Sequence, residues 1–340
     1  MTPPAVARGS RDPELLLAGA REGDRVALAR LLSLVERGGE PMRAVARIAY
    51  RAPVPYTVGL TGAPGAGKST LTDRLITSAR GGWPASAGDG DPGTPIDQVA
   101  VLAVDPSSPF TGGAILGDRI RMQDHATDRS VYIRSMATRG HLGGLALAVP
   151  DAVRVLGAAG MPVVLVETVG VGQMEVEVAS AADTTVVVVN PGWGDSMQTS
   201  KAGLLEVADL FVINKADRPG VAEARRDLQQ MLDLSGHVDW RPPVVETVAA
   251  TGEGVDRLWE EIAGHRRYLL GKGLLEQRRS SRLEQGLRRI LAERLAVQVE
   301  SAATGEAFAG VLDSLVQGRL DPYGAADRIL GPEPVTPASF

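Results

Sequence analysis

Short apolar runs alternate with amphipathic stretches through the middle of the chain. Seven of these runs are rich in valine, leucine and isoleucine and favour β-strands; they are Tyr56–Leu60, Val99–Val104, Val131–Ser135, Pro162–Val166, Thr184–Val189, Leu210–Ile213 and Val244–Val248. Continuous apolar strands separated by helices are typical of a parallel sheet that is covered on both faces. The pattern therefore predicts an α/β fold with a mostly parallel sheet.

Helical patterns flank this region on both sides. Before it, Asp12 precedes a proline that can open a helix, Asp24 can cap a second helix, and Met42–Tyr50 gives a third. After it, residues 274–299 carry leucines at helical spacing among many charges, and Ala307–Val316 predicts one more helix. We therefore expect three parts: a helical N-terminal extension (1–55), an α/β domain (56–264) and a helical C-terminal arm (265–340).

Composition limits the classes of protein to consider. The 340 residues, 44% of them hydrophobic, can bury a full core, and a net charge of −5 provides no basic surface for nucleic acid. The lack of cysteine excludes disulfides and thiolate metal sites. No apolar run approaches the roughly 20 residues of a membrane helix, and the first residues lack the apolar core of a signal peptide. We expect a cytoplasmic protein without nucleic-acid or membrane partners.

The segment GLTGAPGAGKST, residues 59–70, carries the strongest chemical signal. It fits G-x-x-x-x-G-K-[ST] and lies between an apolar strand and a helical stretch, the context of a phosphate-binding P-loop. Backbone amides of such a loop surround phosphates, Lys68 reaches the β- and γ-phosphate oxygens, and the Ser69 hydroxyl can bind Mg²⁺. The residues expected to contact the nucleotide are Gly62, Ala63, Pro64, Gly65, Ala66, Gly67, Lys68, Ser69 and Thr70.

A second motif, NKAD at residues 214–217, follows an apolar strand and indicates which base is bound. Asp217 can accept hydrogen bonds from guanine N1 and from the exocyclic amine, an arrangement that adenine does not offer. The segment VAATGEG, residues 248–254, lies where a backbone donor for the guanine carbonyl is expected. The combination favours GTP over ATP. The residues expected at the base are Asn214, Lys215, Asp217, Ala249 and Ala250.

Acidic residues near strand ends are candidates for binding Mg²⁺. Asp105 ends one apolar strand, Asp118 follows later, and Glu167 ends the strand that leads into LVETVGVGQ, residues 165–173. A turn aspartate and a helix cap are the alternatives for Asp105 and Asp118. Many nucleotide hydrolases follow the glycine of this loop with a glutamine that orients water, whereas this chain has Val171. We therefore expect slow intrinsic hydrolysis.

Six segments together resemble one family, the methylmalonyl-CoA mutase-associated GTPases of the MeaB/ArgK type, which includes the human methylmalonic aciduria type A protein. They are GAPGAGKST, VDPSSPFTGGAILGDRIRM, SMATRGHLGGLA, LVETVGVGQMEVEV, NPGWGDSMQTSKAGLLEVAD and NKAD. The resemblance extends over about residues 12–330. It implies a homodimeric P-loop GTPase whose C-terminal arm mediates dimerisation and which binds GTP or GDP with Mg²⁺.

The resemblance also implies a biological role. The family acts as chaperones of an adenosylcobalamin-dependent acyl-CoA mutase, with methylmalonyl-CoA mutase expected here and isobutyryl- and hydroxyisobutyryl-CoA mutases as alternatives, and the mutase stimulates GTP hydrolysis. These GTPases gate cofactor loading from a cob(I)alamin adenosyltransferase and protect or reactivate the mutase. Tight binding of cobalamin by this chain alone is not expected.

By the same resemblance, three acidic residues receive roles near the phosphates. Glu167 matches the Walker B carboxylate, and Asp105 and Asp118 match acidic switch positions near Mg²⁺. The expected metal site is then Ser69, Asp105, Asp118 and Glu167, and the expected catalytic residues are Lys68, Asp105 and Glu167.

The segment Asn190–Lys201 matches a mobile loop that transmits the nucleotide state to the mutase, with Lys201 at its end. Lys201 is one of only four lysines in a chain that otherwise uses arginine. Ser196 stands where a second acidic residue is expected, which leaves Asp195. The residues expected to couple nucleotide and partner are Gly170, Gln173, Asp195 and Lys201.

Three other functions stay open at this point. A metal-insertion GTPase should carry a cluster of histidine or cysteine, yet the four histidines have no metal-binding spacing and cysteine is absent. A kinase linked to amino-acid transport would need an acceptor site and gains nothing from guanine selectivity. A nucleotide-regulated binding module with negligible turnover differs from a GTPase only in its kinetics.

Overall fold

The computed structural model describes residues 11–84, 96–105, 125, 127–137, 144–168, 181–192, 207–234 and 239–331. The chain divides into two compact units, Met1–Arg278 and Arg279–Phe340. No helix among the described residues is long and apolar enough to cross a membrane.

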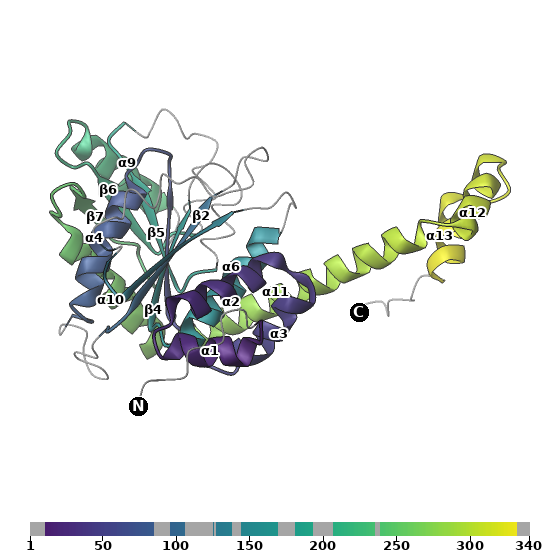
Figure 1. Cartoon of the computed structure of the whole chain (residues 1–340). Helices are drawn as coiled ribbons and strands as arrows, with labels where there is room; N and C mark the ends of the chain where they lie inside the picture. The colour runs from purple at the N-terminus through teal and green to yellow at the C-terminus, as the bar shows by residue number, and fades with distance from the viewer. Residues whose placement is uncertain are drawn as a thin grey trace. The chain divides into compact units, whose positions relative to one another are not determined.

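The predicted parallel sheet is confirmed (Figure 1). Its seven strands lie in the order β3-β2-β4-β1-β5-β6-β7, and each neighbouring pair is parallel. The strands are β1 (Tyr56–Gly62), β2 (Val99–Asp105), β3 (Val131–Ala137), β4 (Val163–Thr168), β5 (Thr184–Val189), β6 (Leu210–Asn214) and β7 (Val244–Thr247). Each expected strand is present, with bounds shifted by at most two residues.

Helices cover both faces of the sheet because successive side chains of a strand point to opposite faces. On β2, Val99 and Val101 join a cluster with α4 (Lys68–Arg80) and α10 (Val255–Gly271). Ala100 and Leu102 join the opposite cluster, which includes α6 (Gly144–Ala158) and three N-terminal helices. A third cluster packs α9 (Val221–Leu234) against β5 and β6.

The three N-terminal helices are α1 (Pro13–Arg21), α2 (Arg25–Arg37) and α3 (Gly39–Ala49). Asp12 and Asp24 cap the first two as the sequence indicated, because each carboxylate accepts a backbone N–H of the first turn. The third helix begins three residues before the expected Met42. Both α2 and α3 pack on α6, and Glu36 of α2 accepts two hydrogen bonds from Arg134 of β3.

Among the described residues, three helices follow α10: α11 (Leu274–Ala302), α12 (Glu306–Val316) and α13 (Pro322–Leu330). The first two lie close to their expected ranges. Helix α13 was not predicted from the sequence, although Asp321 followed by proline repeats the signal that opens α1. The Asp321 carboxylate accepts from the amides of Tyr323 and Gly324, which lowers its pKa.

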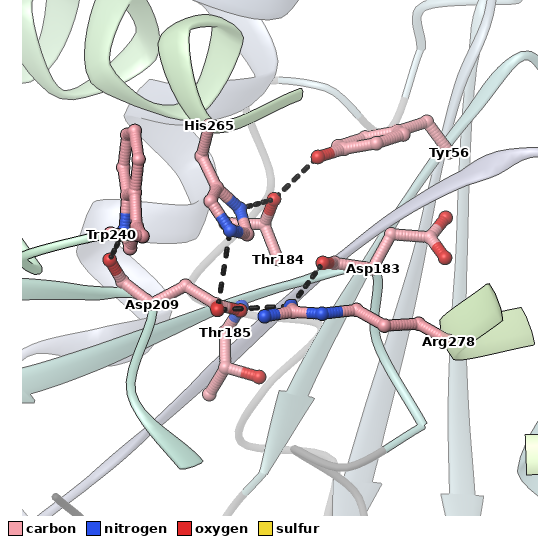
Figure 2. Close-up of polar contacts among 8 residues, drawn as sticks. All are labelled: Tyr56, Asp183, Thr184, Thr185, Asp209, Trp240, His265 and Arg278. Carbon is pink, nitrogen blue, oxygen red and sulfur yellow. Dashed lines mark hydrogen bonds and ion pairs between the residues drawn. The ribbon is translucent and has the colours of Figure 1, made fainter. Parts of the chain in front are cut away.

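A cluster of buried polar residues lies at the edge of the sheet where the strands begin (Figure 2). At its centre is Asp209, directly before β6. Its carboxylate lies 3.0 Å from the Arg278 guanidinium and 3.3 Å from Nε2 of His265, and it accepts the backbone N–H of Thr185 at 2.9 Å. The indole of Trp240 donates to the Asp209 carbonyl. These contacts fasten α10 and the first turn of α11 to the strand edge.

The same cluster continues to β1 through Thr184. Nδ1 of His265 and the Thr184 hydroxyl are 2.8 Å apart, and that hydroxyl lies 2.5 Å from the Tyr56 hydroxyl. His265 is fully buried. Burial raises the pKa of Tyr56 well above its ordinary value, so this phenol stays neutral. These contacts give His265 a structural role in the fold.

We expect the Asp209 carboxylate to stabilise the fold in a pH-dependent way. Burial by itself would raise its pKa, but the hydrogen bond and charge of His265, with Arg278, outweigh burial and lower the pKa. A lowered folded-state pKa stabilises the protein above the ordinary value of about 4, and this contribution is lost as the pH falls through the folded-state pKa.

Replacing Asp209 with asparagine should lower the free energy of unfolding at pH 7 by roughly 3 kcal/mol, because the variant leaves the half-buried Arg278 guanidinium and the buried His265 ring without their carboxylate partner. Urea denaturation from pH 7 to about pH 2 should show the stabilities of the two chains converging below about pH 4. Asp233→Asn is the matched control, since Asp233 pairs with Arg241 on the surface and should change stability by less than about 1 kcal/mol. Equal effects of the two substitutions at pH 7 would contradict the role of Asp209.

Candidate nucleotide-binding site

The phosphate-binding loop connects the central strand β1 to α4, so it lies at the edge where the strands end. Gly62 has φ +132°, and a Cβ there would collide with the carbonyl oxygen of Val188 on β5. Gly67 has φ +93°, and its Cβ would collide with the Asn214 side chain. Both glycines of the motif are therefore required by positive φ and by close approach.

The first turn of α4 provides an anion-binding arrangement. Gly67 is the N-cap of this helix and makes no side-chain cap, so backbone N–H groups of the first turn have no capping side chain. The Lys68 ammonium lies back over the loop, 2.5 Å from the Gly62 carbonyl and 3.1 Å from that of Ala63. Lys68 is buried, while Thr70 is exposed at the helix surface. A phosphate can compete with these carbonyls for the ammonium.

Ser69 and Glu167 meet beside this loop. The Ser69 hydroxyl donates to Oε1 of Glu167 at 2.5 Å, and both residues are buried. Glu167 lies near the end of β4, level with Leu60 of β1. A hydroxyl and a carboxylate are the hard oxygen donors that Mg²⁺ prefers, and Mg²⁺ takes only one or two carboxylates besides phosphates and water. This pair therefore fits the expected metal, and no larger group of acidic or histidine ligands occurs among the described residues.

Of the other residues predicted for the metal site and the switch, only Asp105 has a described backbone. Asp105 is the last residue of β2, so its backbone lies at the same sheet edge, but its side chain lies outside the described part. The others lie outside the described residues altogether: Asp118, Gly170, Gln173, Asp195 and Lys201.

Asn214 joins three loops. Its buried side chain donates from Nδ2 to the Ala66 carbonyl in the phosphate-binding loop at 2.8 Å. Its Oδ1 accepts from the Thr247 hydroxyl and from the Ala249 amide, each at 3.1 Å. One amide group therefore fixes the loop after β1, the loop after β6 and the loop after β7 relative to one another.

Lys215 links the base motif to the phosphate loop. Its ammonium donates to the Gly65 carbonyl at 2.6 Å, so its aliphatic stem lies along the loop. Lys215 has φ +60°, the one positive value at a non-glycine position among the described residues, and such strain persists where surrounding contacts hold it. The Ala216 amide donates to the Thr247 carbonyl, and Asp217 follows, exposed to solvent and available to a base.

One residue of this region has no signal in the sequence. Arg74 of α4 donates to the carbonyls of Ala249 and Ala250, across 175 and 176 residues of chain. No motif contains it, and an arginine on a helix surface looks like any other solvated charge.

The phosphate-binding loop at the end of a central parallel strand, joined through asparagine to an N-K-x-D segment, defines a P-loop nucleoside triphosphatase of the GTPase type. A sequence model of the family described as "Methylmalonyl Co-A mutase-associated GTPase MeaB" matches residues 28–304. The chain belongs to this family of GTPases.

Relatives support the same placement. A protein of Pyrococcus abyssi named as a GTPase is 48% identical over 322 residues, which cover 93% of this chain and 95% of that protein. The Mus musculus "Methylmalonic aciduria type A homolog, mitochondrial" is 31% identical over 340 residues, covering 93% of this chain and 78% of the relative. A crystal structure titled "LAO/AO transport system kinase" has a TM-score of 0.67 at 27% identity, covering 94% of this chain and 97% of that one.

We expect Asn214→Ala to loosen all three loops at once. The substitution leaves the buried Ala66 carbonyl and the Thr247 hydroxyl without their partner, which should lower the free energy of unfolding by roughly 3 kcal/mol. Thermal unfolding and GDP titration should show a lower melting temperature and weaker binding. Asn190→Ala is the control for stability, since Asn190 bonds only to its neighbour Pro191 among the described residues. A variant with unchanged melting temperature and GDP affinity would contradict the joining role.

Proposed function

We propose that this GTPase is a chaperone of an adenosylcobalamin-dependent acyl-CoA mutase, with methylmalonyl-CoA mutase as the partner. It gates cofactor loading and protects or reactivates the mutase. The observation that carries the proposal is the family match over residues 28–304, in a chain whose phosphate and base loops are held together by Asn214. The 31% identity to the mouse methylmalonic aciduria type A homolog supports the same partner.

In this proposal the chain has three parts: an N-terminal helical extension (1–55), a GTPase domain (56–264) and a dimerisation arm (265–340). Nucleotide contacts come from the loop Gly62–Thr70 at the phosphates. Guanine contacts come from Asn214, Lys215, Asp217, Ala249 and Ala250. The contacts of Asn214 and Lys215 with the phosphate loop support this assignment, because they hold base and phosphate loops at a fixed separation.

Hydrolysis in the proposed site is catalysed by positioning and charge. Lys68 binds the β- and γ-phosphate oxygens and counters the charge that develops on them. Ser69, Asp105, Asp118 and Glu167 would hold Mg²⁺, which supplies positive charge to the same oxygens when bound. The buried contact between Ser69 and Glu167 supports their place in this set, and Asp105 and Glu167 are the carboxylates proposed for catalysis.

Turnover by the chain alone is proposed to be slow, because Val171 occupies the position where many hydrolases have a water-orienting glutamine. Gly170, Gln173, Asp195 and Lys201 would couple the nucleotide state to the partner. Hydrolysis would then occur after the mutase binds, and the bound nucleotide, GTP or GDP, would indicate whether a productive complex has formed.

Two alternatives use the same fold. The structural relative is titled a transport system kinase, and a kinase would transfer the γ-phosphoryl group to an acceptor instead of water. Phosphate transfer to an amino acid or a transporter component would support that function. A metal-insertion GTPase should carry cysteine or clustered histidine ligands, but this sequence has no cysteine and four scattered histidines.

The proposed assembly is a homodimer that binds GTP or GDP with Mg²⁺, works in the cytoplasm and accepts cofactor from a cob(I)alamin adenosyltransferase. Leucines at helical spacing on α11 support dimerisation by the arm, because an exposed apolar stripe favours association. Leu283, Leu287, Leu291 and Leu295 are 46, 57, 49 and 60% exposed.

The mutase should accelerate hydrolysis. We expect GTP turnover by the chain to rise roughly ten-fold or more with an adenosylcobalamin-dependent mutase, because a partner can complete the catalytic charge and water positioning. Phosphate release is measured with methylmalonyl-, isobutyryl- and hydroxyisobutyryl-CoA mutases in parallel. Fast turnover of the isolated chain that no mutase changes would refute the mechanism.

Lys201→Ala should reduce the stimulation while GTP affinity stays near that of the wild type, because the residue is proposed to couple the nucleotide to the partner. Lys272→Ala is the matched control, since Lys272 is an exposed lysine after α10. Equal stimulation of both variants would contradict the role of Lys201.

Charge on the apolar stripe should separate the dimer. Leu287→Asp combined with Leu291→Asp places two carboxylates on the proposed interface, where burial of unpaired charge is strongly unfavourable. Light scattering after size exclusion should give the mass of two chains for wild type and of one chain for the variant. Arg288→Gln is the control on the same helix, where Arg288 forms an exposed ion pair with Glu284. A dimeric double variant would show that another surface forms the dimer.

A further inference from the structure

Arg74 lies in the second turn of α4, outside the phosphate-binding motif. Its Nε donates to the Ala249 carbonyl at 3.3 Å, and its Nη2 donates to the Ala250 carbonyl at 3.1 Å. The planar guanidinium carries five N–H donors in a rigid arrangement, so it can bind two neighbouring carbonyls together. One side chain therefore fixes two consecutive peptide groups of the loop after β7.

The backbone N–H groups of this loop differ in whether they have a hydrogen-bond acceptor. The Ala249 N–H donates to Asn214 at 3.1 Å, and the Thr251 N–H donates to the Val248 carbonyl at 3.0 Å. Within the described part of the chain, the N–H of Ala250, which lies between them, has no acceptor. Ala250 is also exposed, whereas Ala249 is buried. The loop thus presents one backbone donor to its surroundings.

The direction of this donor follows from the contacts of Arg74. The Ala249 carbonyl and the Ala250 N–H belong to the same planar trans peptide group, so they point in opposite directions. Because Arg74 holds the carbonyl, the N–H must point away from Arg74. If this peptide group flipped, a carbonyl would replace the N–H. A carbonyl accepts from an amine, such as the one at C6 of adenine, while an N–H donates to an oxygen, such as the one at C6 of guanine.

We propose that Arg74 is a specificity-determining residue that positions the Ala249–Ala250 peptide group to donate to the 6-oxo oxygen of a guanine nucleotide. Arg74 does not touch the base; it excludes the flipped peptide that would accept the 6-amino group of adenine. The inference rests on the proposed guanine site and deepens it. Asp217 recognises the N1 and 2-amino groups of the base, and Arg74 positions the peptide group that recognises the 6-position.

The test compares three nucleotides that differ at C6. GDP carries oxygen there, 6-thio-GDP carries sulfur, a weaker acceptor, and ADP carries an amine. Arg74→Ala should weaken GDP binding roughly three- to ten-fold, the effect of one neutral hydrogen bond. It should weaken 6-thio-GDP by a smaller factor and leave ADP binding unchanged or stronger. Affinities are measured by calorimetry on the full chain, and thermal unfolding checks that the variant is folded.

Two further variants sharpen the result. Arg74→Lys retains a single ammonium that can hold one carbonyl, so its GDP affinity should lie between those of wild type and Arg74→Ala. Arg80→Ala removes the other arginine of α4, which pairs with Asp128, and should leave the preference for GDP over ADP unchanged.

The proposal is overturned if Arg74→Ala binds GDP as wild type does. It is also overturned if the variant loses GDP and 6-thio-GDP affinity by the same factor, since general damage to the site would have that effect. A wild-type chain that binds GDP and ADP equally would instead refute the guanine site itself, whatever the Arg74 variants do.

Discussion

The hydrogen bonds of the Asn214 side chain are the contacts on which the whole nucleotide edge depends. Loops after parallel strands have no ladder of their own to hold them, so they need side chains to fix their separation. Asn214 supplies one donor to the phosphate loop and one acceptor to the loop after β7. Gly67 has to be glycine because this amide lies against it. The identity of one residue in the base motif therefore constrains a residue in the phosphate motif.

Lys215 and Arg74 extend this arrangement with two cations that bind only backbone carbonyls among the contacts described. Lys215 holds Gly65 from the base loop, and Arg74 holds Ala249 and Ala250 from α4. Each contact ties a loop to a neighbouring element and occupies the carbonyl oxygens that it binds. Phosphates and a guanine carbonyl are both rich in acceptors, so a site for them needs N–H groups facing inward and C=O groups facing elsewhere.

The sequence was sufficient for the sheet and for the motifs, and insufficient for the contacts that orient them. The seven apolar runs became strands because a buried strand between helices needs apolar side chains on both faces, and this requirement is local. The two motif glycines and Asn214 were also recognisable locally. Arg74 and Ala250 are 176 residues apart, and Arg278 and Asp209 are 69 apart. Such pairs follow from the packing of helices on the sheet, which no pattern of neighbouring residues encodes.

The same packing explains why the polar chemistry occurs at two opposite edges. β6 has five residues, all buried, with Asp209 directly before it and Asn214 as its last residue. Between them the strand packs apolar side chains against both helical layers, as its neighbours do. A charged group within β6 would lose hydration without gaining partners, so Asp209 and Asn214 lie at the two ends of this strand. One edge carries the loops with the phosphate and base motifs, and the other carries the ion cluster in which Asp209 contacts His265 of α10 and Arg278. The short buried strand β6 thus separates the loops at its C-terminal end from the ion cluster around Asp209 at its N-terminal end.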